Sequence, residues 1–246
     1  MERAAKPEAA SEASWPLIGR REELANLTAA LRLQRSRLVL GPPGSGKTRL
    51  VQEAVRLAGQ PHVWIQHPGV LHALLVELAE QLRCRLQRFK TLDRATSIAL
   101  KPAVLESLRK EPRCIVIEDF SHGDPRTYRF FQEIYYISGT CLVVTATSRS
   151  DLGFLGKLLW DPREEITLGP LSRSEAKQLF DLAAERFELR SLDLDDFRPK
   201  VLAAAHGNPG KIVAMCRFAS RAEYQSGRHI KFYPLWIDVL ASMSHP

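Results

Sequence analysis

The sequence predicts an α/β protein with a parallel sheet, helices on both faces of that sheet, and a small all-helical domain at the carboxyl end. Short apolar runs alternate with amphipathic helical patterns between residues 37 and 168, which is typical of parallel strands joined by helices. A Gly-rich loop at residues 41–48 directly follows the first of these runs. Beyond Pro170 the strand signals stop and only helical periodicity remains.

The apolar runs are expected to form five strands, and the segments between them are expected to form helices. The segment 94–110 has helical character, with Pro102 as a candidate interruption. Ser172 and Glu175 have the spacing of a capping box, which predicts the start of a helix. The runs expected as strands lie at 37–40, 62–66, 114–117, 141–144 and 166–168.

Four segments are expected along the chain. Residues 1–14 are rich in Ala, Glu and Lys and have no apolar centre, which indicates a disordered lead and not a signal peptide. Residues 15–169 would form the sheet domain and residues 170–220 the helical domain. The remaining segment, 221–246, is expected to be a tail, whose apolar stretch 232–237 either packs on the helical domain or docks a partner.

The Gly-rich loop fits the pattern G-x-x-x-x-G-K-[ST], the phosphate-binding loop of nucleoside triphosphatases. Glycines let successive backbone N–H groups turn inward around phosphate oxygens, and the following helix points its positive end at the same anion. Lys47 is expected to reach the β- and γ-phosphates and Thr48 to bind Mg²⁺. The alternative is an ordinary Gly-rich turn. The residues predicted to hold the phosphates are Gly41, Pro42, Pro43, Gly44, Ser45, Gly46, Lys47, Thr48 and Arg49.

Two carboxylates, Glu118 and Asp119, end the third apolar run. Nucleotide hydrolysis needs one carboxylate for the Mg²⁺ water shell and a second group to orient the attacking water. The usual order is Asp then Glu, so here Glu118 would take the metal position and Asp119 would polarise water with a shorter side chain, which predicts slow hydrolysis. The alternative is that both acids only end a strand. Thr145 or Thr147, at the end of the fourth run, could sense the γ-phosphate or simply fill a strand.

Composition limits the classes of partner. The chain has 246 residues and a net charge of +7, which suits a polyanionic partner such as duplex DNA but equally an Arg-rich surface with no such partner. No apolar run approaches the ~18 residues of a membrane span, so no membrane is expected. Four scattered cysteines without paired spacing indicate reduced thiols and a cytoplasmic protein. Candidate polyanion-binding groups are Arg83, Arg85, Arg88 and Lys90; Arg126 and Arg129; and Arg217, Arg221, Arg228 and Lys231.

With these motifs in order, the chain resembles the AAA+ superfamily, and within it the branch of Orc/Cdc6-like initiators, transposition helper ATPases of the TnsC and TniB kind, and STAND signalling ATPases. Residues 17–24 are similar to the opening box, in which Ile18 would pack near adenine. Residues 168–172 are similar to the hinge into the helical lid, and residues 207–212, with Pro209 and Lys211, to the lid motif that reaches the γ-phosphate. Lys211 stands where Arg is common and lacks the Arg fork.

The resemblance implies a protein that binds Mg²⁺ and ATP or ADP, hydrolyses ATP slowly as a switch, and assembles into a homo-oligomeric ring or filament. Arg163, or failing it Arg149, would be the arginine finger of a neighbouring subunit; the alternative is a surface arginine beside acids. Two functions compete: a DNA-associated helper that recruits a partner enzyme, and a STAND-like regulatory ATPase that acts on an unidentified protein partner without DNA. The winged-helix domain of most Orc-like members is not expected, because too few residues follow the lid.

Overall fold

The computed structural model describes residues 15–66, 70–86, 91–120 and 125–244. Its five-stranded sheet has the order β2-β3-β4-β1-β5, and every neighbouring pair is parallel. The predicted parallel α/β fold is therefore confirmed. The strands are β1 (Arg37–Leu40), β2 (His62–Gln66), β3 (Cys114–Glu118), β4 (Cys141–Ala146) and β5 (Glu165–Thr167).

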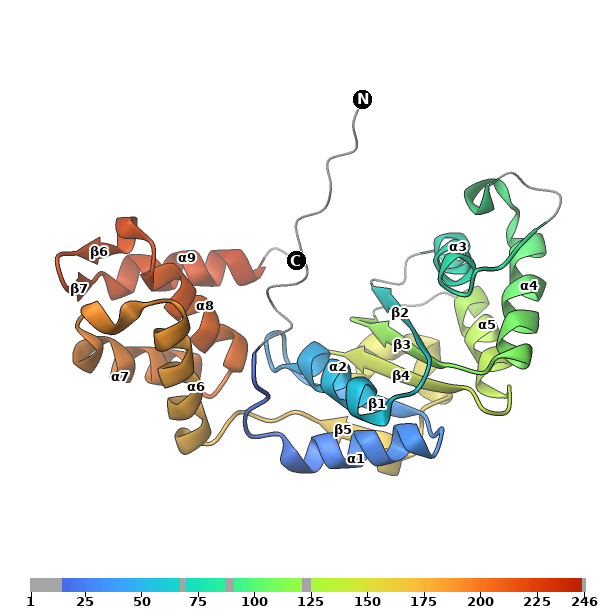
Figure 1. Cartoon of the computed structure of the whole chain (residues 1–246), viewed down its shortest axis with the longest axis horizontal. Coiled ribbons are helices and arrows are strands. Elements are labelled where there is room, and N and C mark those ends of the chain that lie inside the picture. The colour runs from blue at the N-terminus through green and yellow to red at the C-terminus, as the bar shows by residue number, and fades with distance from the viewer. Residues whose placement is uncertain (1–14, 67–69, 87–90, 121–124, 245–246) are drawn as a thin grey trace.

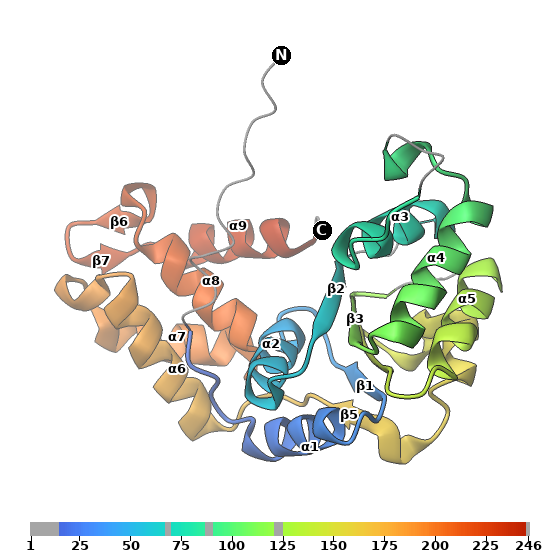
Figure 2. The same ribbon diagram turned by 45° about the vertical axis from the view of Figure 1, so that its right-hand side comes forward.

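Helices cover both faces of this sheet (Figures 1 and 2). Because successive strand side chains point to opposite faces, Val39 packs with α1 (Arg21–Arg32) and α2 (Lys47–Ala58). Leu38 and Leu40 belong instead to the apolar cluster on the other face. The helices on that face are α3 (Leu71–Gln81), α4 (Ser97–Lys110), α5 (Pro125–Tyr135) and the 3₁₀ segment Arg149–Lys157.

The predicted helix 94–110 begins later than expected. A short 3₁₀ turn (Leu92–Arg94) precedes α4, which starts at Ser97 and continues through Pro102. Pro102 cannot donate to the carbonyl four residues earlier. Pro102 and Ile98 are both exposed, so water can reach the helix at this point.

The helical domain comprises residues 171–244 and has its own apolar core. It contains α6 (Arg173–Arg186), α7 (Leu194–Ala205), α8 (Pro209–Ala219) and α9 (Phe232–Ser244), with a hairpin of β6 (Gln225–Ser226) and β7 (His229–Ile230) before α9. The predicted capping box opens α6: Ser172 accepts from the Glu175 N–H and Glu175 from the Ser172 N–H.

The segment after residue 220 packs on the helical domain, which is one of the two alternatives expected for its apolar stretch. Leu235 and Val239 of α9 are fully buried in the core of the helical domain, with Phe180 and Met215. The hairpin returns the chain so that α9 packs along α8 (Figure 1). The boundary predicted at residue 220 therefore falls inside this domain. The predicted lead at 1–14 lies outside the described residues.

Among the described residues, no helix is long and apolar enough to cross a membrane.

Candidate nucleotide-binding site

The Gly-rich loop joins the carboxyl end of β1 to the start of α2. Gly44 and Gly46 have φ values of 76° and 95°, which glycine adopts without strain, and Gly46 is the N-cap of α2. Lys47 is buried at the first position of α2, and its ammonium donates to the carbonyls of Gly41 (2.8 Å) and Pro42 (3.4 Å). Burial lowers the pKa of Lys47, while Asp119, Glu118 and Asp151 oppose that shift.

The loop has the features that a triphosphate requires. Ser45 is buried, and its hydroxyl has no hydrogen-bond partner among the described residues. A Cβ at Gly41 would lie 2.7 Å from that hydroxyl, so only glycine leaves the space beside it open. A buried donor without a partner, an ammonium held by the loop's own carbonyls and a helix N-terminus together fit a phosphate group. Ser45 and Lys47 would hold the phosphates there.

The acid pair lies beside the loop. Glu118 ends β3 and is only 6% exposed; its Oε1 accepts a hydrogen bond from the Thr48 hydroxyl and its Oε2 one of 2.9 Å from the Trp64 indole. The two predicted metal ligands, Thr48 and Glu118, are thus in direct contact. Oxygen donors of this kind suit Mg²⁺.

Asp119 is half exposed, and its Oδ1 lies 4.0 Å from the Lys47 ammonium. Its φ of 47° is uncommon for a non-glycine residue. Thr145 holds this conformation, because its hydroxyl accepts from the Asp119 N–H (2.9 Å) and its carbonyl accepts from the Phe120 N–H (2.9 Å). Thr145 is fully buried in β4, whereas Thr147 is exposed. The structure therefore gives Thr145 a role in shaping the acid pair, and γ-phosphate sensing stays a prediction for either threonine.

The helical domain touches the phosphate loop directly. The Asn208 side-chain amide donates to the Pro43 carbonyl (2.9 Å), and the Gly210 N–H donates to the Gly44 carbonyl (2.8 Å). The Asn208 amide oxygen also caps α8 through the Lys211 N–H (3.1 Å). The predicted lid motif thus lies on the loop. Pro209 occupies the first position of α8, and the Lys211 ammonium lies 5.7 Å from the centroid of the Trp236 ring on α9.

The predicted opening box lies between the two domains. Ile18 packs against the core of the helical domain together with Trp15. Arg49, predicted with the phosphate-binding residues, donates instead to the Trp15 carbonyl (2.8 Å) and so anchors the opening box on α2. Arg20 is buried and donates to the Gly169 carbonyl at the hinge (2.5 Å).

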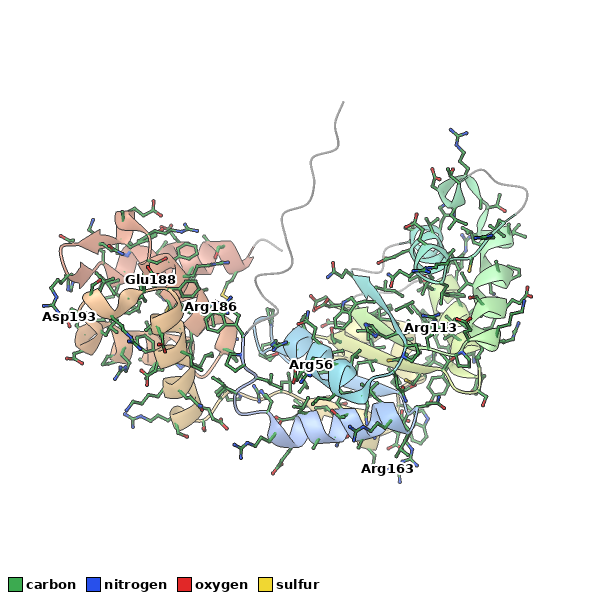
Figure 3. All side chains as sticks on the ribbon, viewed as in Figure 1. Arg56, Arg113, Arg163, Arg186, Glu188 and Asp193 are labelled. Atoms are coloured by element: carbon green, nitrogen blue, oxygen red, sulfur yellow. The ribbon has the colours of Figure 1, made fainter. Side chains whose placement is uncertain are left out.

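The two candidate finger arginines are both paired with acids, and Arg163 lies away from this loop. Arg163 belongs to the short 3₁₀ turn Pro162–Glu164, is 90% exposed and pairs with Asp161 (2.8 Å). It precedes the amino end of β5, whereas the phosphate loop follows the carboxyl end of the parallel neighbour β1. Figure 3 places it on the underside of the core, near the carboxyl end of α1 and away from the helical domain. Arg149 is bound to Glu165 (2.9 Å).

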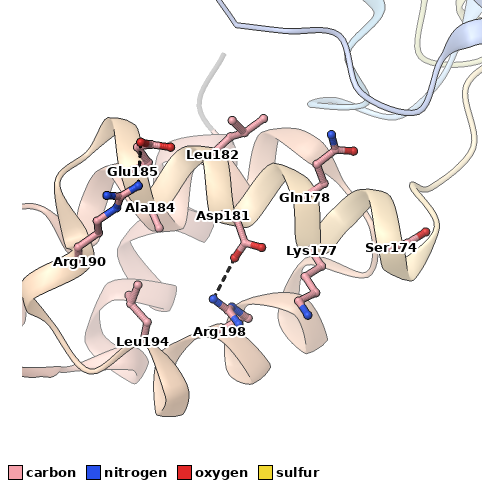
Figure 4. Close-up of a pocket in the computed structure, with 10 residues that line it drawn as sticks. All are labelled: Ser174, Lys177, Gln178, Asp181, Leu182, Ala184, Glu185, Arg190, Leu194 and Arg198. Carbon is pink, nitrogen blue, oxygen red and sulfur yellow. Dashed lines mark hydrogen bonds and ion pairs between the residues drawn. The ribbon is translucent and has the colours of Figure 1, made fainter.

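The helical domain also carries a cavity of about 660 Å³ on α6 and α7 that includes no residue of the phosphate loop. Two of its cations are paired with acids: Arg198 with Asp181 (2.9 Å) and Arg190 with Glu185 (2.8 Å) (Figure 4). Because these two cations are already paired with carboxylates, the cavity suits a triphosphate less well than the phosphate loop does.

Comparison with known proteins agrees with this geometry. The sequence model of the AAA ATPase domain matches residues 16–194. No curated protein matches the chain by sequence.

Solved structures share the fold at low identity. The Orc1 protein of Aeropyrum pernix, solved in complex with DNA, has a TM-score of 0.65 and 18% identity, over 96% of this chain and 68% of its own. The Cdc6p of Pyrobaculum aerophilum has a TM-score of 0.66 and 18% identity, over 90% and 66%. A STAND protein of Pyrococcus horikoshii with a tetratricopeptide repeat sensor has a TM-score of 0.54 and 20% identity, over 94% and 34%. The chain thus spans about two thirds of the first two proteins and one third of the third.

Proposed function

The chain belongs to the AAA ATPase domain family, and we propose that it binds Mg²⁺-ATP between its sheet domain and its helical domain and hydrolyses it slowly as an assembly switch. One observation carries this proposal: the phosphate loop contacts Glu118 through Thr48 on one side and α8 through Pro43 and Gly44 on the other. A nucleotide on the loop would therefore act on both domains at once.

Each residue of the site has a chemical role in this proposal. Lys47 exchanges the Gly41 carbonyl for the β- and γ-phosphates, and its positive charge is favoured by the nearby carboxylates. Thr48 and Glu118 would hold Mg²⁺, which when bound neutralises charge on the phosphates. Asp119 orients the attacking water. Its short side chain and half-exposed position give it a weaker hold on that water than a longer, buried acid would have, so turnover is slow.

Assembly would complete the site. Arg163 projects into solvent beyond the amino end of β5, so within one subunit it is remote from the phosphate loop. A neighbouring subunit could bring it to the γ-phosphate, where a further positive charge stabilises the transferring group. A heterologous ring or filament offers that geometry, because each subunit presents its finger on one face and its site on another.

The partner we favour is duplex DNA, with the protein acting as a helper that recruits an enzyme. The net charge of +7 supports a polyanion, and among the described candidates Arg217, Arg221 and Arg228 are all exposed in the helical domain. Arg88 and Lys90 lie outside the described residues. The alternative is a STAND-like regulatory ATPase with a protein partner, which the exposed aromatic side chains of Tyr136 and Trp160 favour.

A salt series separates the two functions. With ATP and Mg²⁺ present, DNA binding measured by filter retention should fall log-linearly with salt, with a slope that counts phosphate contacts. Arg217→Glu should lower both the DNA affinity and the slope of its salt dependence. Its matched control is the charge-preserving variant Arg217→Lys. Negligible binding at low salt would leave the protein partner. Light scattering in the same buffers should show a mass well above 27.7 kDa with ATP, and a monomer at all concentrations would contradict assembly.

A further inference from the structure

Trp64 is on strand β2, next to strand β3, which ends at Glu118. The proposed function assigns Glu118 to the metal. In the β2–β3 register, Trp64 faces Val116 and Gln66 faces Glu118, so Trp64 and Glu118 are diagonal neighbours. Both side chains are on the same face of the sheet, the face covered by α2, which carries Thr48. The indole of Trp64 spans this diagonal, since its N–H reaches the Glu118 carboxylate at 2.9 Å.

The two carboxylate oxygens of Glu118 have different partners. Oε1 accepts from the Thr48 hydroxyl, and Oε2 accepts from the Trp64 indole N–H at 2.9 Å. The indole is a donor only and cannot bind a cation. It therefore occupies Oε2 of the carboxylate and leaves Oε1 directed at Thr48. A hydrogen bond to an ionised carboxylate is also stronger than a neutral one.

The backbone of Trp64 is fixed from outside the sheet. Strand β2 is at the edge of the sheet, where one side of the backbone is normally unpaired. The Gln81 side chain on α3 fills that side: its Oε1 accepts from the Trp64 N–H (2.9 Å) and its Nε2 donates to the Trp64 carbonyl (2.6 Å). The ring packs partly buried against the α1–α2 cluster. The backbone of Trp64 and its indole ring are thus both held in place.

We propose that Trp64 is a positioning residue for the metal ligand Glu118. Glutamate has one more rotatable bond than aspartate, so a carboxylate at this position needs a further anchor to hold one orientation, and the indole N–H supplies it. This inference rests on the proposed function. The gain in ATP affinity on addition of Mg²⁺ should therefore depend on Trp64. The ATP affinity without metal should not depend on Trp64.

The test is titration of a fluorescent ATP analogue into the full chain, once with Mg²⁺ and once with EDTA. Trp64→Phe keeps a ring and removes the N–H. The ratio of the ATP affinity with Mg²⁺ to the ATP affinity in EDTA should be about ten-fold smaller in this variant than in the wild type. That change corresponds to about 1.4 kcal/mol, which is near the lower end for a hydrogen bond to a charged group. The affinity in EDTA should stay within about two-fold. The matched control is Trp160→Phe, whose ring is 70% exposed and which should change neither value.

Other outcomes are equally informative. An unchanged Mg²⁺-dependent gain, or an equal loss with and without Mg²⁺, would overturn the positioning role while nucleotide binding stands. A wild-type protein that binds no nucleotide in either buffer would remove the proposed function and this inference together.

If Trp64→Phe does not fold, the wild-type protein supplies the answer. In ¹⁵N-tryptophan-labelled protein, the Trp64 indole resonance can be assigned by removing Trp15, Trp160 and Trp236 in turn. That resonance should shift when Mg²⁺ is added to the nucleotide complex, and a stationary resonance would overturn the proposal.

Discussion

Gly210→Ala tests the contact between the helical domain and the phosphate loop. Gly210 is the second residue of α8 and has no left-handed φ, so its backbone accepts alanine without strain. In an isolated helix the change would stabilise by up to about 1 kcal/mol. In this structure the added Cβ would lie 2.7 Å from the Gly44 Cα and 3.1 Å from the Gly44 carbonyl oxygen, which are both backbone atoms.

The costs exceed that gain. Overpacking of a tight contact costs roughly 1–3 kcal/mol, and separation of the two backbones also breaks the Gly210 N–H bond to Gly44, worth about 0.5–1.5 kcal/mol. With a helix gain of up to about 1 kcal/mol subtracted, the docked arrangement should be disfavoured by about 0.5–4.5 kcal/mol. ATP affinity should also fall, because displacement of α8 removes its contacts to the phosphate loop.

The assay is urea unfolding together with fluorescent-ATP titration. The matched control is Gly156→Ala, where a Cβ would meet only Leu152 at 3.5 Å, an ordinary van der Waals contact, and where affinity should not change. A Gly210→Ala protein that is more stable than wild type, with unchanged ATP affinity, would show that α8 does not rest on the loop and refute the reasoning.

Three further predictions follow from single contacts. Thr145→Val leaves the Asp119 N–H without its acceptor and should lower the free energy of unfolding in urea by about 1–3 kcal/mol, with partial recovery in Thr145→Ser; equal midpoints for all three proteins would contradict this role. Because phosphate binds protonated Lys47, and burial lowers the pKa of Lys47 from its ordinary value of 10.5, ATP affinity should fall as the pH is raised toward 10.5 and the ammonium loses its proton; an affinity that stays constant up to pH 10.5 in a fluorescence titration would count against it. Arg163→Ala should lower phosphate release more than about ten-fold with little change in ATP affinity, and mixing it with Lys47→Ala subunits should restore part of the turnover; no recovery would argue against a finger in trans.

The sequence predicted those parts of the molecule that depend on local pattern. The five strands and the capping box at Ser172 and Glu175 are where apolar runs and spacing indicate them. The phosphate loop opens α2 as its motif requires. Each of these features is specified by residues close together in the chain, so a single sequence contains the whole signal.

Contacts between distant segments could not be read in the same way. The Trp64–Glu118 bond depends on strand order and register, which place a β2 side chain diagonal to the end of β3. Arg49 follows the loop in sequence, yet its guanidinium turns to the Trp15 carbonyl, a partner fixed only when the opening box packs on α2. The apolar stretch at 232–237 admitted packing or docking, and only the hairpin geometry places Leu235 in the core.

Equilibrium dialysis of the intact protein against ATP and Mg²⁺ tests the central claim most directly. We predict one ATP bound per chain in the wild type and a marked loss in Lys47→Ala, because the buried ammonium is the main cation that the phosphate loop offers to the triphosphate. No bound ATP or ADP in the wild type at millimolar nucleotide, or equal binding in Lys47→Ala, would contradict the assignment of this loop as a nucleotide site.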